Sequence, residues 1–242
     1  SGAAVAARSD ADAVGVLMLN TSFRRFVGDI GNPLTWGFPV RYRIVEEARA
    51  SCVVRAEPAD LLEAFKEAAD ELVSEGVVGL VTSCGFLSLY QRALADHCRV
   101  PVATSSLLQA ASIERMLPAG RRVGVLTYDA ASLTRAHLEA VGAAPDTPVV
   151  GMGPQSRFAR WIREDDASPD FAALGAEVVA AAERLKARHP EVGAILCECT
   201  NMAPFSALIG DRLGLPVFDV VTLVNWFHAG LRPNRFRNAR EN

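Results

Sequence analysis

The sequence lacks long apolar runs and any concentration of charge of one sign. No stretch reaches the roughly 20 apolar residues that a bilayer span needs, and no signal-peptide pattern opens the chain. Its 25 basic and 28 acidic residues give a net charge of -3 and are spread along the sequence. Nucleic-acid-binding domains usually carry a basic face. We therefore expect a cytoplasmic protein that binds neither membrane nor nucleic acid.

Signals for a cofactor or a metal are also missing. Only two lysines occur, Lys66 and Lys186, and both fall in amphipathic helical runs, which disfavours a pyridoxal phosphate Schiff base. No glycine-rich phosphate loop follows a strand. The five cysteines lack the spacing of a disulfide framework or a zinc site. We expect no cofactor and no metal, and we interpret Cys52 and Cys98 as small buried apolar side chains.

Two similar halves are present instead. Half of the 242 residues are hydrophobic, which is enough for a substantial core. An apolar run that ends in Cys84 recurs 115 residues later in a run that ends in Cys199. Residues 14–17 and 123–126 both read Val-Gly-Val-Leu and precede the two cysteine runs in the same way. The chain is therefore interpreted as two copies of one unit.

Within each copy, short apolar runs alternate with amphipathic helical segments. The predicted strands are 14–19, 77–82, 100–103, 122–127, 147–152, 193–198 and 216–219. The predicted helices are 61–73, 86–97, 105–116, 131–141, 170–188, 203–212 and 221–230. This alternation is typical of parallel sheets covered on both faces. We expect an α/β protein with two pseudo-symmetric, Rossmann-like lobes and the active site in the cleft between them.

The predicted boundaries are 13–117 for the first lobe, 118–230 for the second and 231–242 for a polar tail, with the C-terminal helix as an alternative completion of the first lobe. Residues 20–57 show no clean periodicity and contain many turn-forming residues. They follow the carboxyl end of the first strand, where open parallel sheets bind their ligands. We interpret this segment as a flap over the cleft; the alternative is a surface loop without ligand contact.

The two matching cysteines offer acid–base chemistry. Each comes at the end of a predicted strand and before a helix, where backbone N–H groups and the helix dipole lower a thiol pKa from about 8.5. A thiolate on one side can remove a proton while the opposite thiol delivers one, which inverts a carbon next to a carboxylate. Gly85 permits close approach of a substrate to the backbone. The alternative is that both are core cysteines; Cys197 is interpreted as structural.

Several motifs resemble those of the aspartate/glutamate racemase superfamily. They are Thr-Ser-Cys-Gly-Phe at 82–86 and Glu-Cys-Thr-Asn-Met at 198–202, and the resemblance extends over residues 13–230. This superfamily includes hydantoin racemases, maleate isomerases, arylmalonate decarboxylases and some dimethylsulfoniopropionate lyases. Gly-Asp-Ile-Gly-Asn-Pro at 28–33 is similar to the loop of the branch that contains the algal-type lyases.

The resemblance implies roles for individual residues. Cys84 and Cys199 become the two acid–base groups of a homodimeric enzyme. The substrate-binding residues implied or inferred are Asn20, Thr21, Gly85, Phe86, Tyr128, Thr200 and Asn201. Asn20 stands where amino-acid racemases have a carboxylate, Gly85-Phe86 where they have Asn-Thr, and Asn201 where glutamate racemases have histidine. These departures argue against glutamate itself as the substrate.

The function expected is a cofactor-independent racemase or epimerase that acts beside the carboxylate of a small amino acid or related acid. A lyase, in which one thiolate removes a proton and a leaving group departs from the next carbon, is the first alternative. A maleate-type isomerase and a non-catalytic two-lobed binding protein are the others. Arg24 and Arg25 are candidates to bind a distal carboxylate, although adjacent arginines on a loop also commonly face solvent.

Overall fold

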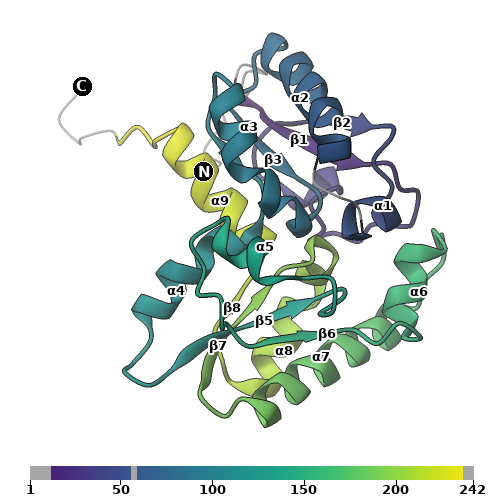
Figure 1. Cartoon of the computed structure of the whole chain (residues 1–242), viewed down its shortest axis with the longest axis vertical. Helices are drawn as coiled ribbons and strands as arrows, with labels where there is room; N and C mark the ends of the chain where they lie inside the picture. Colours follow the sequence, from purple (N-terminus) through teal and green to yellow (C-terminus); the bar gives the residue numbers. More distant parts are fainter. Residues whose placement is uncertain (1–11, 56–58, 237–242) are drawn as a thin grey trace, which may run out of the picture.

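The computed structural model describes residues 12–55 and 59–236, and within them the strands form two four-stranded parallel sheets of identical order (Figure 1). The first sheet has the order β2-β1-β3-β4 and the second β6-β5-β7-β8. The strands of the first sheet are β1 (Val14–Leu19), β2 (Val40–Val45), β3 (Gly79–Thr82) and β4 (Val102–Ala103). Those of the second are β5 (Arg122–Thr127), β6 (Val149–Gly151), β7 (Val192–Cys197) and β8 (Val217–Phe218). The predicted fold class is confirmed.

Helices cover both faces of these sheets. The α-helices are α1 (Ala50–Arg55), α2 (Ala59–Ser74), α3 (Gln91–His97), α4 (Ala110–Met116), α5 (Arg135–Glu139), α6 (Arg157–Arg163), α7 (Phe171–Arg188), α8 (Ser206–Leu213) and α9 (Val220–Leu231). Short 3₁₀ helices are η2 (Pro33–Thr35), η3 (Gly85–Tyr90), η4 (Ser106–Gln109) and η5 (Thr200–Phe205). In the part of the chain that the structure covers, no helix is both long and apolar enough to span a membrane.

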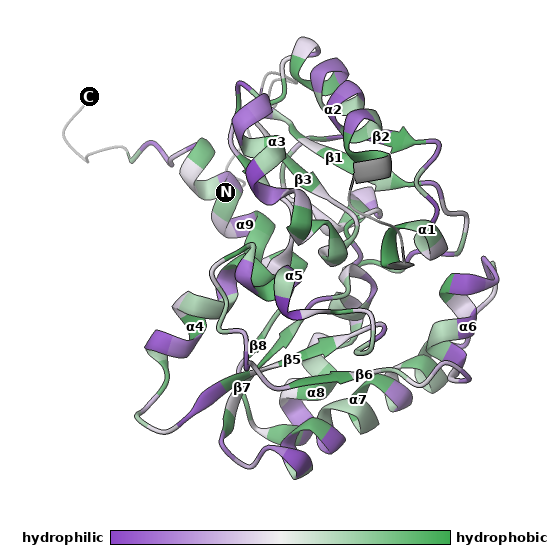
Figure 2. Ribbon diagram, viewed as in Figure 1, coloured by the Kyte–Doolittle hydropathy of each residue, from purple (hydrophilic) through white to green (hydrophobic). Residues whose placement is uncertain are grey.

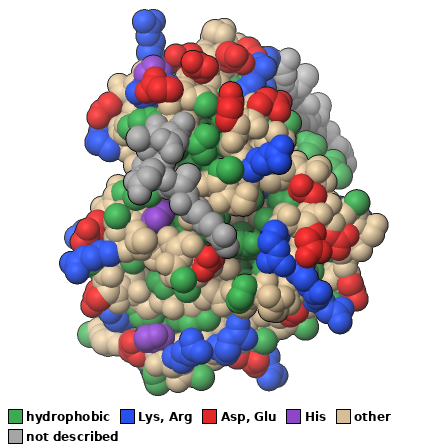
Figure 3. Space-filling view, turned by 45° about the vertical axis from the view of Figure 1, so that its right-hand side comes forward, with side chains coloured by type: hydrophobic (Ala, Val, Ile, Leu, Met, Phe, Trp, Pro, Cys, Tyr) green, Lys and Arg blue, Asp and Glu red, His purple; other side chains and the backbone are tan. Residues whose placement is uncertain are grey.

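The central strands are apolar along their whole length because helices lie on both of their faces. Every residue of β1 is buried, and so are all residues of β3 and all but one of β7. Figure 2 shows these strands as hydrophobic and the outward faces of the surrounding helices as hydrophilic. Basic and acidic side chains are intermingled over the face shown in Figure 3.

Two helices cross from one half of the chain to the other. Helix α9 follows the last strand of the second sheet but packs on the first, where Phe227 and Leu231 lie against Gly79 of β3. Helix α4 follows the last strand of the first sheet, and its Ile113 belongs to the same core cluster as Val123 of β5. The two sheets therefore share helices across their junction, and the carboxyl ends of β3 and β7 meet there.

Several local expectations differ from the structure. The region 20–57, expected to be a loop, contains β2 and α1; β2 is an edge strand whose Arg41 and Arg43 form ion pairs with Glu75, so it lacks an apolar run. Helix α6 was not expected, and the predicted helices at 86–97, 105–116 and 203–212 each begin as a 3₁₀ helix.

Two further expectations concern side chains and chain ends. Cys52 is exposed on α1, so its predicted burial is wrong, whereas Cys98 is half-buried against the core of the first sheet. The strands of the two sheets fall within the predicted ranges 13–117 and 118–230. Residues 237–242 of the predicted tail lie outside the described residues.

Candidate active site

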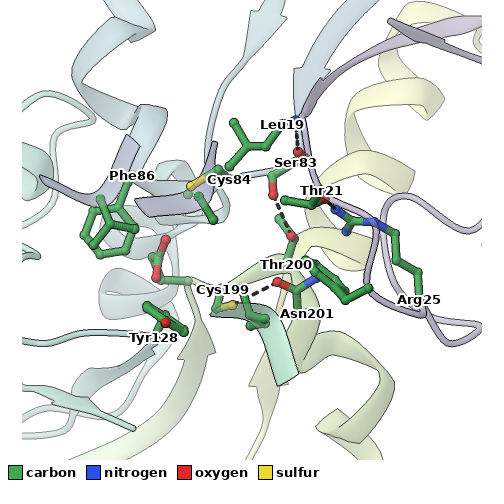
Figure 4. A pocket seen from close by; sticks show the side chains of 16 residues that line it. Leu19, Thr21, Arg25, Ser83, Cys84, Phe86, Tyr128, Cys199, Thr200 and Asn201 are labelled. Atoms are coloured by element: carbon green, nitrogen blue, oxygen red, sulfur yellow. Dashed lines mark hydrogen bonds between the residues drawn. The ribbon is translucent and has the colours of Figure 1, made fainter. Parts of the chain in front are cut away.

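The two cysteines that the sequence singled out line one cavity between the sheets (Figure 4). Cys84 follows β3 and is the N-cap residue of η3, while Cys199 follows β7 and is the N-cap residue of η5. The matching strand order of the two sheets places both positions at the same junction. Cys84 is half-buried and Cys199 is buried.

Most of the predicted substrate-binding residues line the same cavity. These are Thr21, Gly85, Phe86, Tyr128, Thr200 and Asn201. Asn20 does not: it lines an adjoining outer hollow, and its side chain donates a 2.9 Å hydrogen bond to the carbonyl oxygen of Glu46. Phe86 lines the cavity and also contacts the ring of His137 edge-on in the core.

The cavity is small. The volume open to the centres of water-sized spheres is about 40 Å³. By the same measure, one water molecule needs about 10–15 Å³. The outer hollow offers about 720 Å³ by the same measure and shares Thr21, Ala50, Val54, Tyr128 and Ile162 with the cavity. The inner cavity therefore suits a compact ligand, and the outer hollow adjoins it.

Both thiols have raised pKa values, so the expected lowering is wrong. Burial, followed by the nearby Glu198 carboxylate, raises the pKa of the Cys84 thiol to about 12, although backbone N–H groups of Phe86 and Leu87 act in the opposite direction. Burial and Glu198 also raise the pKa of Cys199 well above its ordinary value. The N–H groups at the helix starts are present as expected, but loss of solvation outweighs them.

Glu198 is a further residue of the cavity, which the sequence reasoning did not single out. Its carboxyl group is buried, lines the cavity and accepts a 2.6 Å hydrogen bond from the hydroxyl of Thr127. Burial raises its pKa to about 7, against the lowering effects of Thr127 and the backbone N–H of Tyr128. A β-carbon at Gly85 would lie 2.6 Å from the Glu198 carbonyl oxygen, so Gly85 makes room for this residue. The available signal was its place beside Cys199 at the end of a buried strand.

The loop after β1 brings an arginine into the cavity. Arg25 forms a 2.8 Å ion pair with buried Asp29 and donates a 2.8 Å hydrogen bond to the hydroxyl of Thr21. Asp29 also accepts a 2.6 Å hydrogen bond from the side-chain amide of Asn201, whose oxygen lies 3.5 Å from the Cys199 sulfur. The predicted flap therefore contacts the cavity through Arg25, which does not face solvent; its binding of a distal carboxylate stays a prediction.

Hydrogen bonds also join the two strand ends directly. The hydroxyl of Thr200 donates to the carbonyl oxygen of Ser83 at 2.8 Å, and the Ser83 hydroxyl accepts from the Leu19 N–H at 2.9 Å. These bonds fix the residues next to both cysteines. Among the described residues, no group of three or more His, Cys, Asp or Glu side chains is arranged to hold a metal ion.

Solved structures with this fold include racemases and a decarboxylase. Arylmalonate decarboxylase matches with a TM-score of 0.59 and 17% identity, over 93% of this chain and 94% of its own. Allantoin racemase from Klebsiella pneumoniae matches with a TM-score of 0.58 and 18% identity, over 90% of this chain and 87% of its own. Glutamate racemase from Francisella tularensis matches with a TM-score of 0.56 and 16% identity, over 95% of this chain and 86% of its own. The chain thus has the fold of the aspartate/glutamate/hydantoin racemase superfamily, as its motifs predicted.

Sequence similarity identifies a narrower group of relatives. The chain is 27% identical over 229 residues to a dimethylsulfoniopropionate lyase of Durusdinium sp. clade D, covering 91% of this chain and 75% of that protein. It is 29% identical over 238 residues to dimethylsulfoniopropionate lyase 5 of Emiliania huxleyi, covering 92% of this chain but 46% of the relative. The chain therefore spans from about half to three quarters of these curated relatives. No protein-family model matches it.

Proposed function

We propose that the protein is a cofactor-independent lyase that removes a proton next to the carboxylate of a small acid bearing a sulfonium leaving group, with dimethylsulfoniopropionate as the first candidate substrate. The observation that carries this proposal is the cavity between the sheets, into which both Cys84 and Cys199 project. The relatives named dimethylsulfoniopropionate lyases favour elimination over other outcomes of the same proton removal.

The reaction needs one base and one leaving group. The Cys84 thiolate takes the proton from the carbon beside the carboxylate, and the electrons of that C–H bond form the carbon–carbon double bond. The carbon–sulfur bond breaks, and its electron pair leaves with dimethyl sulfide. Acrylate remains, and the proton passes from the Cys84 thiol to solvent. The Arg25 guanidinium faces the substrate carboxylate and stabilises the negative charge that develops there.

The assignment of Cys84 as the base follows from the surroundings of the two thiols. Cys84 is the less buried of the pair, and its sulfur accepts hydrogen bonds from the backbone N–H groups of Phe86 and Leu87. Cys199 accepts from one N–H, that of Asn201, and also lies 3.5 Å from the Asn201 side-chain oxygen, an acceptor that favours the protonated thiol. Cys84 is thus suited to lose its proton and Cys199 to keep one.

A racemase is the second candidate, because the second thiol favours it. Elimination requires a single base, whereas inversion requires a proton donor on the opposite face, a role that Cys199 would fill. The homodimer and the cytoplasmic location expected from the sequence stay predictions.

Proton NMR in heavy water separates these candidates. With dimethylsulfoniopropionate we expect vinyl signals and dimethyl sulfide, and we expect Cys84→Ser to lower turnover by about 10²–10⁴-fold, the range for loss of a general base. Cys98→Ser is the matched control and keeps full turnover. Exchange of an α-proton in an amino acid without vinyl signals would establish the racemase. Full activity in both Cys84→Ser and Cys199→Ser would exclude a thiol mechanism.

A further inference from the structure

The Glu198 carboxylate has no role in the chemistry proposed above, yet it lies in the reaction cavity. Its effects on both Cys84 and Cys199 place its charge close to the two thiols. Its partners are the Thr127 hydroxyl and the Tyr128 backbone N–H, neither of which is cationic. The cavity arginine, Arg25, is already paired with Asp29. Burial therefore disfavours the ionised form of Glu198, and a cation bound beside it would stabilise that form.

The cavity has two chemically different ends. In Figure 4, Phe86 and Tyr128 lie on one side of the two cysteines and Arg25 lies on the other. Glu198 belongs to the aromatic end, since it contacts Gly85, the residue before Phe86, and receives the Tyr128 N–H. Aromatic rings attract organic cations, including those with methyl groups on the charged atom. One end thus suits a cation and the other an anion.

We propose that Glu198, together with the rings of Phe86 and Tyr128, binds the cationic head group of a zwitterionic substrate whose carboxylate faces Arg25. This inference rests on the proposed function and names the substrate class that the site accepts: a short carboxylic acid with a sulfonium or quaternary ammonium group. A zwitterion adds a positive charge at the Glu198 end, and its carboxylate meets the Arg25 guanidinium, which has N–H donors beyond those given to Asp29 and Thr21.

Cation binding at Glu198 also changes the acid–base balance of the cysteines. The Glu198 charge raises the pKa of Cys84 and of Cys199. A bound cation offsets that charge, and the thiolate of Cys84 then forms more readily. The substrate consequently assists the ionisation of its own base.

Equilibrium binding of two ligands of the same shape tests this subsite. The probes are 3-(trimethylammonio)propionate and 4,4-dimethylpentanoate, which differ only in a nitrogen cation replacing a carbon atom. Calorimetry at about pH 8.5 keeps the Glu198 carboxylate ionised. We expect the wild-type protein to bind the cationic probe about tenfold more tightly or better, as desolvated charge pairs do. Glu198→Gln brings the ratio close to one, and Glu198→Asp preserves a preference for the cation.

Asp170→Asn is the matched control, because it removes the same charge from an exposed helix cap and leaves the ratio unchanged. A ratio near one in the wild-type protein overturns the inference without any variant, so misfolding cannot obscure the result. A tenfold ratio that persists in a folded Glu198→Gln protein overturns it as well. Because binding is measured without turnover, absence of lyase activity beside a clear charge preference would refute the proposed reaction and leave the subsite standing.

Discussion

Glu198, Cys84 and Cys199 are three acidic groups in one cavity from which most water is excluded. Each ionised group disfavours ionisation of the others, since charges interact more strongly away from water. Glu198 has the lowest pKa of the three, about 7, and it therefore ionises first as the pH rises. Its charge then adds to the effect of burial and favours the protonated form of both thiols. The protonation state of Glu198 thus influences the reactivity of the cysteines.

Removal of the Glu198 charge is therefore expected to make Cys84 more reactive. In Glu198→Gln the pKa of the Cys84 thiol falls. At a fixed pH below that pKa, the rate of its alkylation rises about three- to fourfold for each unit of the fall, because a larger thiolate fraction outweighs a lower nucleophilicity. Mass spectrometry of the peptide that contains Cys84 measures this rate. Cys52, which is exposed, is the internal control and reacts equally in both proteins. An unchanged or slower reaction at Cys84 would show that Glu198 does not act on this thiol.

Glu198 also imposes a pH dependence on stability. Its pKa is raised from 4.5 in the unfolded chain to about 7 in the folded protein, so the folded state holds the proton more tightly between these values. The contribution of this residue to stability is full below about pH 4.5 and falls as the pH rises to about 7, by about 3 kcal/mol in total.

Urea unfolding of wild type and Glu198→Gln at several pH values checks this direction. As the pH rises from about 4.5 to about 7, the wild-type protein should lose stability relative to the variant. The other carboxylates are present in both proteins, so their contributions to the unfolding free energy cancel in this difference. A difference that stays constant with pH would mean that Glu198 has an ordinary pKa in the folded state.

The loop between β1 and β2 has one backbone position on which its placement depends. Gly28 has φ of +101°, and a β-carbon there would lie 3.0 Å from the Cα atom of Pro204 in η5. Gly28→Ala is expected to destabilise the protein by about 1–3 kcal/mol through backbone strain. Because this loop carries Arg25, KM for the substrate should rise as well. Thermal unfolding and steady-state kinetics measure the two effects.

Gly37→Ala is the control for that substitution. Gly37 lies in the same loop, but a β-carbon there would have no neighbour within 4 Å. This variant should keep both its melting temperature and its KM. If Gly28→Ala also leaves them unchanged, the loop adapts without strain, and its contact with η5 does not position Arg25.

Elements with both faces buried could be predicted from sequence, and the others could not. The run Val14–Leu19 is wholly apolar because helices cover β1 on both sides, so its pattern is unambiguous. The edge strand β2 contains Arg41 and Arg43, which reach acidic residues of α2 and the turn after it, and its composition resembles a loop. The packing of α9 on the first sheet depends on contacts between segments that are far apart in the sequence. A local sequence pattern does not predict such contacts.

Some features of the candidate site could likewise be predicted from the sequence, and others could not. Cys84 and Cys199 could be found because the two halves repeat, and a repeat relates positions far apart in the chain. The raised thiol pKa values could not be foreseen, since they depend on how much solvent the closed cavity excludes. Glu198 was visible in the motif, but whether a residue at a strand end faces the cavity or the core depends on the path of the backbone.

The crossing of α4 and α9 means that neither half completes its core alone. Leu223 and Val224 of α9 are buried in the same cluster as Val14 and Val16 of the first sheet. At the junction itself, the Ser106 hydroxyl donates a 2.7 Å hydrogen bond to the carbonyl oxygen of Cys197. Unfolding of one sheet therefore exposes apolar surface of the other, and the cavity between them exists only when both are folded.

Leu223→Ala tests this coupling. Truncation of a fully buried leucine costs about 2–5 kcal/mol. Although Leu223 belongs to a helix packed on the first sheet, we expect amide hydrogen exchange to accelerate equally in the peptides that contain β1 and β5, because both open in one cooperative event. Leu34→Ala is the control, since Leu34 is 78% exposed and its loss should leave both rates unchanged. Faster exchange in β1 alone would show that the halves unfold independently and that the shared helices do not couple them.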